Sequence, residues 1–208
     1  MRKTASPDRL KFISPQLPRL VETPPESDDW IHEIKYDGYR TQVIIDWDGA
    51  RAYTKTGIDW TSRYWPIVTA AEALGARSAI IDGEVIAPTP NGAPDFHALR
   101  SAMAWNAERL AFVAFDLLHL DGKDLRALPS VERRAMLWDL VKPADGIIQF
   151  SQRIAAGCRQ PSQTELLDSS SRRTHSALGS LGTWTNLDAT IALIKWRKAH
   201  WCSSLGSP

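Results

Sequence analysis

The chain has 208 residues, of which 43% are hydrophobic and 24% are charged, and its formal net charge is +1. These values are typical of a globular protein and give no overall basic signature of nucleic acid binding. No apolar run approaches the roughly 18 residues that a membrane-spanning helix needs, so we expect no membrane partner. The two cysteines, Cys158 and Cys202, lie far apart in no metal-ligand spacing. They argue against a zinc site or a disulfide framework and favour a cytoplasmic location.

Charge and composition change along the chain. Residues 1–150 carry 18 Lys or Arg against 21 Asp or Glu, whereas residues 151–208 carry 7 against 3. Serine is found 7 times in the first part and 10 times in the shorter second part. Hydrophobic periodicity is also lost after Phe150, and together these shifts predict a boundary near residue 152.

The predicted elements begin after residues 1–28, which are rich in proline and which we expect to form an extended lead-in on the surface. Asp48-Gly49 between two apolar runs predicts a hairpin. Strands are predicted at 30–36, 39–47, 50–55, 78–87 and 109–120. Helices are predicted at 61–75, capped by Thr61 or Ser62, at 95–108, and at 130–141, capped by Ser130. This order predicts an α+β fold with a largely antiparallel sheet; after residue 150 only 189–196 resembles a strand.

Glu33 and Lys35 lie two residues apart in a predicted strand and should therefore project from the same face. The Asp37-Gly38 turn lets Arg40 return toward them. A lysine beside an arginine can serve as a nucleophile, because desolvation and a nearby cation favour its neutral amine. The alternative is a surface strand with a Glu–Lys pair and a simple turn.

Two further segments carry acidic residues in apolar surroundings. Asp82 and Glu84 share one face of a strand otherwise made of Ile, Val and Ala, which is costly unless they bind a cation, a hydroxyl or a basic partner. Alone, such a segment is often only a turn. Phe115-Asp116 follows a run of apolar residues and, taken alone, is more often part of a core.

In order and spacing, these segments resemble the motifs of the covalent nucleotidyltransferases, which include ATP-dependent DNA ligases, RNA ligases and mRNA capping enzymes. Glu33-x-Lys35-x-Asp37-Gly38-x-Arg40 resembles motif I, and Asp82-Gly83-Glu84 resembles motif III. Residues 54–64 resemble motif Ia, and Phe115-Asp116 resembles motif IIIa. Over about residues 12–152, the sequence is most similar to the ligase domain of bacterial non-homologous end-joining ligases. The similar segments are QLPRLVETPP, WIHEIKYDGYR, GIDWTSRY, IDGEVIA and FDLLHLDGKDLR.

The resemblance implies a fold and an activity. The fold would be an α+β antiparallel β-core with flanking helices, of the covalent nucleotidyltransferase (ATP-grasp-like DNA ligase adenylation) type, incomplete at the C-terminus. The activity would be that of the adenylation domain of an ATP-dependent DNA ligase, which forms a lysyl-AMP intermediate for sealing breaks in DNA repair and recombination.

The resemblance also implies a role for each matching residue. Lys35 would attack the α-phosphate of ATP, and Glu33 would accept a hydrogen bond from the adenine amino group. Arg40 and Glu84 would hold the ribose hydroxyls, with Glu84 also near a catalytic Mg²⁺, and Phe115 would stack on the adenine. Lys55 stands where the family usually has an arginine that contacts phosphate or the nick; lysine keeps the charge but loses the bidentate geometry.

The resemblance stops before the motifs that complete the family's pocket. Motif IV, of the form EGxVxK, and the lysine-rich motif V should fall within about 165–200, but the chain contains no Glu-Gly pair, and Lys195-Trp196-Arg197-Lys198 has the wrong order for motif V. We expect no counterpart in these residues of the OB-fold domain that should follow. We therefore divide the chain into a lead-in (1–28), a partial adenylation domain (29–152) and a divergent tail (153–208), expected to pack poorly.

A shifted reading frame after about residue 155 would explain such a tail, and the hypothesis fails if neither alternative frame encodes EGxVxK. Two other readings stay open: a catalytically impaired ligase remnant that at most binds nucleotide, and an RNA ligase or capping-type guanylyltransferase. We expect weak binding to nicked or broken duplex DNA by this chain alone. Arg133-Arg134 is expected on a solvated helix face, and His119 in a structural or surface position.

Overall fold

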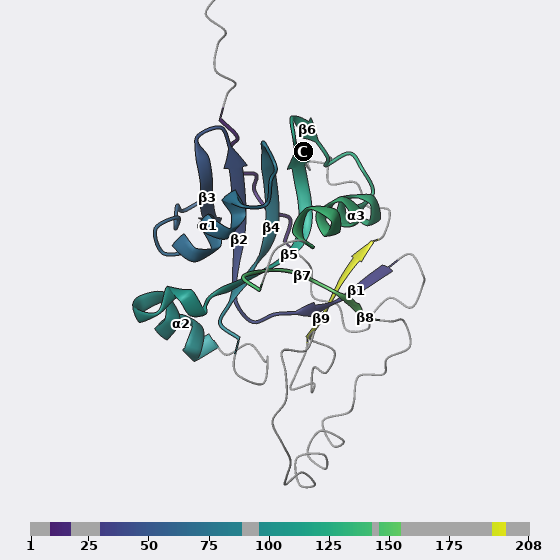
Figure 1. Cartoon of the computed structure of the whole chain (residues 1–208). Coiled ribbons are helices and arrows are strands. Elements are labelled where there is room, and N and C mark those ends of the chain that lie inside the picture. The colour runs from purple at the N-terminus through teal and green to yellow at the C-terminus, as the bar shows by residue number, and fades with distance from the viewer. Residues whose placement is uncertain (1–8, 18–29, 89–95, 143–145, 155–192, 199–208) are drawn as a thin grey trace, which may run out of the picture.

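The protein is described by a computed structural model over residues 9–17, 30–88, 96–142, 146–154 and 193–198. Strands are the most common regular structure in this part of the chain, and the helices pack beside them (Figure 1). The strands are β1 (Trp30–Lys35), β2 (Tyr39–Asp46), β3 (Gly49–Thr54), β4 (Ala79–Ile86), β5 (Ala111–Leu120), β6 (Lys123–Asp124), β7 (Ile148–Phe150), β8 (Arg153–Ile154) and β9 (Leu193–Lys198). The α-helices are α1 (Trp65–Glu72), α2 (Phe96–Trp105) and α3 (Ser130–Val141), and η1 (Ala107–Arg109) is a short 3₁₀ turn.

The strands form two sheets. The large sheet has the order β3-β2-β4-β5-β6, all antiparallel, and β7 pairs with β5 in parallel. The small sheet has the antiparallel order β8-β1-β9. The predicted α+β class with a largely antiparallel sheet is therefore confirmed. Gly49, with φ of +95°, makes the predicted β2–β3 hairpin turn in a backbone conformation that favours glycine.

The start of α1 and the cap of α3 differ from the prediction, while α3 has the predicted bounds of 130–141. Helix α1 begins at Trp65 rather than near 61, because the Thr61 hydroxyl accepts a hydrogen bond from the Ala52 amide (3.1 Å) instead of capping the helix, and Pro66 sits in its first turn. Helix α3 has Pro129, not Ser130, at its N-cap. Proline in the first turn is tolerated because the amide that it lacks would have no helical partner there.

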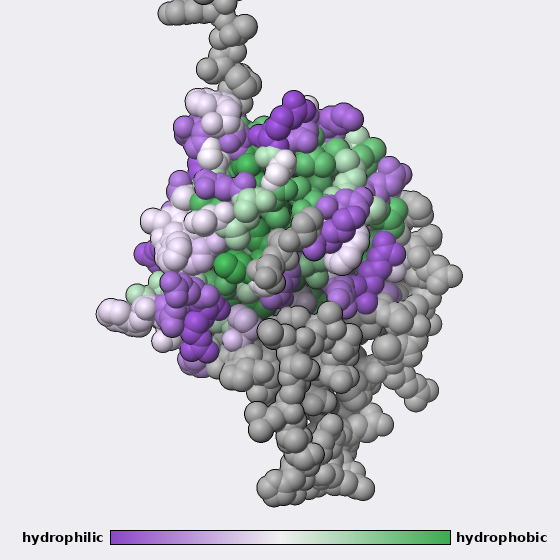
Figure 2. All heavy atoms as spheres, in the orientation of Figure 1, coloured by the Kyte–Doolittle hydropathy of each residue, from purple (hydrophilic) through white to green (hydrophobic). Residues whose placement is uncertain are grey.

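The large sheet has one face toward the helices and one toward the N-terminal segment. On the helix face, Val43, Ile81, Phe112 and Leu137 belong to the main buried core. Figure 2 shows apolar residues gathered across the middle of the molecule in this view, with polar residues toward the edges. The other face carries a smaller buried cluster, formed by Ile44, Ile80 and Leu118 together with Leu10, Phe12, Ile13 and Tyr53.

The N-terminal segment 9–17 has no regular structure, as expected for a lead-in, but side chains of β2 fix it to the sheet. The Gln42 amide accepts from the Ile13 backbone amide (2.8 Å) and donates to the Ile13 carbonyl (3.0 Å). Asp46 accepts a hydrogen bond from the Leu10 amide at 3.0 Å. Gln42, Ile44 and Asp46 alternate along β2, so one face of the strand supports the segment.

At the C-terminal end, the predicted strand at 189–196 corresponds to β9, which pairs with β1 and sets Lys195 opposite Glu33 in the backbone register. The predicted poor packing of residues 155–208 falls, apart from β9, outside the residues that the structure describes.

Candidate active site

The predicted nucleophile Lys35 is the last residue of β1 and is exposed. The chain then turns through Asp37 and Gly38 into β2. A Cβ atom on Gly38 would lie 2.2 Å from the Val85 carbonyl oxygen and 3.0 Å from Cγ of Glu84. Only glycine can come this close to a neighbouring backbone. The turn after Lys35 is therefore packed directly against β4, beside Glu84.

Arg40 connects the three predicted motifs. Its Nε and Nη2 donate to the two carboxylate oxygens of Asp82, at 3.2 and 2.7 Å. Its guanidinium carbon lies 5.5 Å from the centre of the Phe115 ring, within the range of a cation–π contact. Arg40 also stands opposite Glu84 in the β2–β4 register. The structure thus brings Arg40, Glu84 and Phe115 together and confirms that Asp82 has a basic partner.

An irregularity in the β4–β5 pairing accompanies the position of Phe115. Asp82 pairs with Asp116, but the next residue, Gly83, pairs with Ala114, which leaves Phe115 as the extra residue of a β-bulge. Bulges redirect side chains and are frequent beside functional sites. A Cβ on Gly83 would lie 2.4 Å from the Phe112 ring, so this position also requires glycine.

Glu33 lies on β1 and is only 1% exposed. It forms a buried ion pair with Arg134 of α3. The neighbouring Arg133 binds Asp116 through two hydrogen bonds of 2.8 and 3.0 Å. The expectation of a solvated Arg133-Arg134 face is therefore wrong: the two residues are 2% and 1% exposed. The sequence did carry a signal for this burial. Arg133 and Arg134 stand four and three residues before the apolar Leu137, and residues at these spacings share a helix face.

Tyr36 lies between the predicted nucleophile and the turn. It packs against the small cluster of Ile86, Ala111 and Val113. Burial, with a further contribution from the negative charge of Glu33, raises the pKa of the Tyr36 phenol. Tyr36 is therefore neutral at physiological pH and offers a hydroxyl, not a phenolate, beside the motif I strand.

Lys55 is exposed and follows β3, which β2 separates from β4 in the large sheet. It therefore starts from the outer edge of the sheet, away from the strand that carries Phe115. Its predicted contact with phosphate or the nick stays a prediction.

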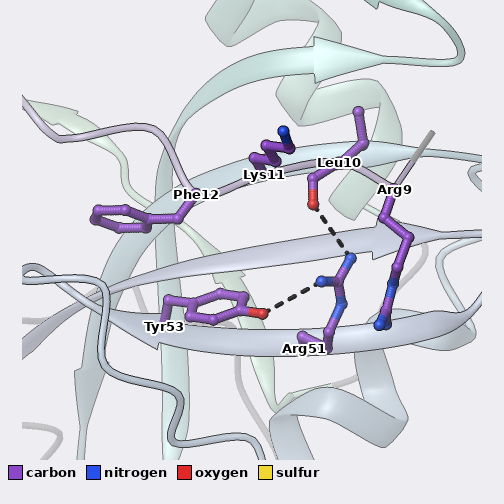
Figure 3. A pocket seen from close by; sticks show the side chains of 6 residues that line it. All are labelled: Arg9, Leu10, Lys11, Phe12, Arg51 and Tyr53. Atoms are coloured by element: carbon purple, nitrogen blue, oxygen red, sulfur yellow. Dashed lines mark hydrogen bonds between the residues drawn. The ribbon is translucent and has the colours of Figure 1, made fainter.

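A hollow of about 360 Å³ lies elsewhere, where the N-terminal segment crosses β3 (Figure 3). Its lining is formed by Arg9, Leu10, Lys11, Phe12, Arg51 and Tyr53, and it includes no predicted site residue. Arg9 and Arg51 already form ion pairs with Asp48 and Asp46. Because the predicted motif residues meet around Arg40 and none of them lines the hollow, we place the candidate active site at Lys35 and Arg40 rather than here.

The carboxylates of the candidate site bear on its proposed metal. Among the residues that the structure describes, no three His, Cys, Asp or Glu side chains gather as ligands. Glu84 is half-buried at the candidate site. One carboxylate suits Mg²⁺, which commonly binds one or two carboxylates together with substrate phosphates.

Comparison with known proteins gives consistent relatives. Over 155 residues the chain is 37% identical to the multifunctional non-homologous end joining protein LigD of Pseudomonas aeruginosa, covering 74% of this chain and 18% of that protein. It is 38% identical over 129 residues to a probable DNA ligase of Mycobacterium avium, covering 58% of this chain and 24% of that protein.

Two solved structures resemble the fold. The ligase domain of LigD from M. tuberculosis has a TM-score of 0.55 at 28% identity, and a mycobacterial DNA ligase D complexed with ATP and MES has 0.53 at 29%. These matches cover 62% and 63% of this chain and 42% of each solved chain. The chain thus spans less than half the length of these relatives.

The family described as "ATP dependent DNA ligase domain" matches residues 15–173, well over half of the chain and past the boundary predicted at 152. The match includes every residue of the motif I, III and IIIa segments that meet at Arg40. The chain belongs to the ATP-dependent DNA ligase domain family.

Proposed function

We propose that this chain binds ATP at the candidate active site and transfers AMP to Lys35, as the adenylation step of an ATP-dependent DNA ligase. The observation that carries the proposal is the position of Arg40, which is bonded to Asp82, lies over Phe115 and faces Glu84 in the sheet register. Residues far apart in sequence, each resembling a nucleotide contact, therefore surround one point beside the turn that follows Lys35.

In the proposed step, the neutral amine of Lys35 attacks the α-phosphorus of ATP. A nitrogen–phosphorus bond forms, the bond from the α-phosphorus to the bridging oxygen breaks, and pyrophosphate leaves. The nitrogen loses its proton to water. Arg40 and Glu84 hold the ribose hydroxyls, and Glu84 is also the residue that would hold Mg²⁺, whose charge would offset that of the phosphates. Glu33 accepts from the adenine amino group and Phe115 stacks on the base.

The AMP would then pass to the 5′-phosphate of a nicked or broken DNA duplex, the substrate class that the family implies. We propose that the 208 residues alone bind DNA weakly and do not join it. Tight binding to duplex DNA needs several contacts from Lys or Arg side chains to the phosphates. Residues 1–150 are net negative, and the lysines of motifs IV and V have no counterpart in the sequence.

Incubation of the chain with α-labelled ATP and Mg²⁺ tests the proposal. We expect covalent label on the wild-type chain, its removal by added pyrophosphate, and none on Lys35→Ala. Lys35→Arg should also remain unlabelled, because a guanidinium stays protonated and cannot attack. Label that persists in Lys35→Ala would reject Lys35 as the nucleophile. ATP binding without any label would instead favour the catalytically impaired remnant.

A further inference from the structure

Arg134 is a buried cation that bonds to two residues of the proposed adenine site at once. Its Nη1 donates to a carboxylate oxygen of Glu33 and, at 3.1 Å, to the backbone carbonyl of Phe115. Its Nη2 donates to the Ser151 carbonyl at 2.5 Å. The Phe150 ring lies 4.7 Å from the guanidinium carbon and packs against it. One nitrogen of a rigid, planar group therefore lies between Glu33 and Phe115.

These two residues come from different sheets. Glu33 belongs to β1 in the small sheet, and Phe115 is the bulge residue of β5 in the large sheet. Adenine recognition requires a fixed spacing between the group that accepts from the base amino group and the ring that stacks on its face. Among the strands that the structure describes, β1 and β5 do not pair with each other, so no sheet hydrogen bond between them sets this spacing. The Arg134 side chain links the two residues directly, because it bonds to the carboxylate of Glu33 and to the backbone carbonyl of Phe115.

The ion pair also has a consequence for base choice. A guanidinium does not lose its proton in proteins, so it favours the ionised form of the carboxylate that it binds, and an ionised carboxylate only accepts hydrogen bonds. Adenine presents an amino donor at its 6-position, whereas guanine presents a carbonyl acceptor there. An acceptor held in place would therefore favour adenine and repel guanine.

We propose that Arg134 is a positioning residue that holds Glu33 at a fixed distance from Phe115 and thereby makes the site selective for adenine over guanine. The inference rests on the nucleotide-binding function proposed above. It assigns Arg134 a role beyond that of buried structural support, which its burial alone would suggest.

Arg133 provides a matched control on the same helix. It is equally buried and binds a buried carboxylate, but the partners described for it are Asp116 and the Leu128 carbonyl, neither of which has a proposed nucleotide contact. Replacing either arginine by lysine keeps the charge and loses the planar fork. Both variants should lose stability, and only Arg134→Lys should change base selectivity.

The test uses the full 208-residue chain with Mg²⁺, and compares the dissociation constants of ATP and GTP by titration calorimetry for wild type, Arg134→Lys and Arg133→Lys. We expect Arg134→Lys to weaken ATP binding at least about tenfold, since it disturbs a hydrogen bond to a charged group. The preference for ATP over GTP should fall with it. Arg133→Lys should keep the wild-type preference, and thermal melts should show both variants folded.

Each other outcome has a defined meaning. Equal ATP preference in Arg134→Lys and Arg133→Lys overturns the positioning role while leaving the proposed function intact. Failure of both Arg134→Lys, which keeps the charge, and Arg134→Gln, which removes it, to fold, with Arg133→Lys folded, assigns Arg134 to structural support alone and also overturns it. A folded wild-type chain that binds no ATP rejects the proposed function, and the inference with it.

Discussion

Arg40 and Asp82, 42 residues apart in the chain, form a two-point hydrogen-bonded ion pair across β2 and β4. Their side chains are 13% and 5% exposed. The remaining terminal nitrogen of Arg40 donates to the Gln16 carbonyl at 2.8 Å. Asp82 and the N-terminal segment therefore hold the guanidinium beside Phe115 before any nucleotide arrives.

Removing the charge of Asp82 should destabilise the protein and misplace Arg40. Asp82→Asn leaves a largely buried guanidinium without its counter-ion, which costs about 3–5 kcal/mol for a buried pair. ATP binding should weaken in the same variant. Urea unfolding measures the stability, with Asp139→Asn as control: its pair with Lys142 is exposed on both sides, so its loss should cost about 0–1 kcal/mol. Equal effects of the two substitutions would show that the Arg40–Asp82 pair is dispensable.

Gly38 should be irreplaceable for a steric reason. In Gly38→Ala the new methyl group would meet the Val85 carbonyl at 2.2 Å, so the turn after Lys35 must move away from Glu84. Gly75→Ala is the control, because nothing lies within 4 Å of its Cβ position and its φ of +76° costs only about 1–2 kcal/mol. We expect a larger fall in unfolding free energy for Gly38→Ala, and the close packing on β4 is refuted if Gly75→Ala is the more damaging.

Gln42 should determine whether the N-terminal segment stays on the sheet. Gln42→Met keeps the volume but leaves the Ile13 amide and carbonyl without their partner, a loss of about 1–3 kcal/mol. Hydrogen exchange at the Ile13 amide should become faster. Gln149→Met, which removes an exposed hydrogen bond to Gly146, is the control and should leave Ile13 unaffected. Unchanged exchange in Gln42→Met would mean that the apolar contacts alone hold the segment.

His119 should make stability fall in mild acid. Burial lowers its pKa below the usual 6.5, against smaller opposing contributions from Asp124 and Asp121. Between the pKa of His119 in the folded chain and its higher pKa in the unfolded chain, the unfolded chain binds more protons. The contribution of His119 to the unfolding free energy is therefore complete above about pH 6.5 and is lost as pH falls through the folded pKa. The pKa of Asp124 is lowered mainly by its hydrogen bond from Arg126, so its contribution to stability is lost only below about pH 4 and does not affect this range.

Unfolding free energies measured from pH 8 to pH 5 check this. The wild-type chain should lose more stability than His119→Gln over that range. Parallel curves for wild type and His119→Gln would contradict the assignment. His119 bonds to Ser78 and accepts from the Gly122 amide, in keeping with its predicted structural or surface position.

The sequence predicted most of the strands because their signals are local. Asp48-Gly49 ends one strand and begins another, and the run from 109 to 120 is apolar enough to be buried on both faces. The short strands β6, β7 and β8 were not predicted, since two or three residues carry no periodicity and they form only by pairing with β5 or β1.

The arrangement of the candidate site was predicted in part. The motif residues of β2, β4 and β5 meet as expected, because strand pairing turns sequence order into proximity. The partners of Glu33 and Asp116 could not be read from the motifs, since they come from a helix whose approach depends on packing. The bulge at Phe115 likewise depends on the β4–β5 register, which no local signal sets.

The most direct test of the account is to locate the AMP. The full chain is incubated with ATP and Mg²⁺, digested, and analysed by mass spectrometry for a peptide that carries adenylate. We predict a single adduct on the peptide that contains Lys35, sensitive to acid as a nitrogen–phosphorus bond should be. An adduct on another lysine, such as Lys55, or a chain that binds ATP and forms none, would contradict the account.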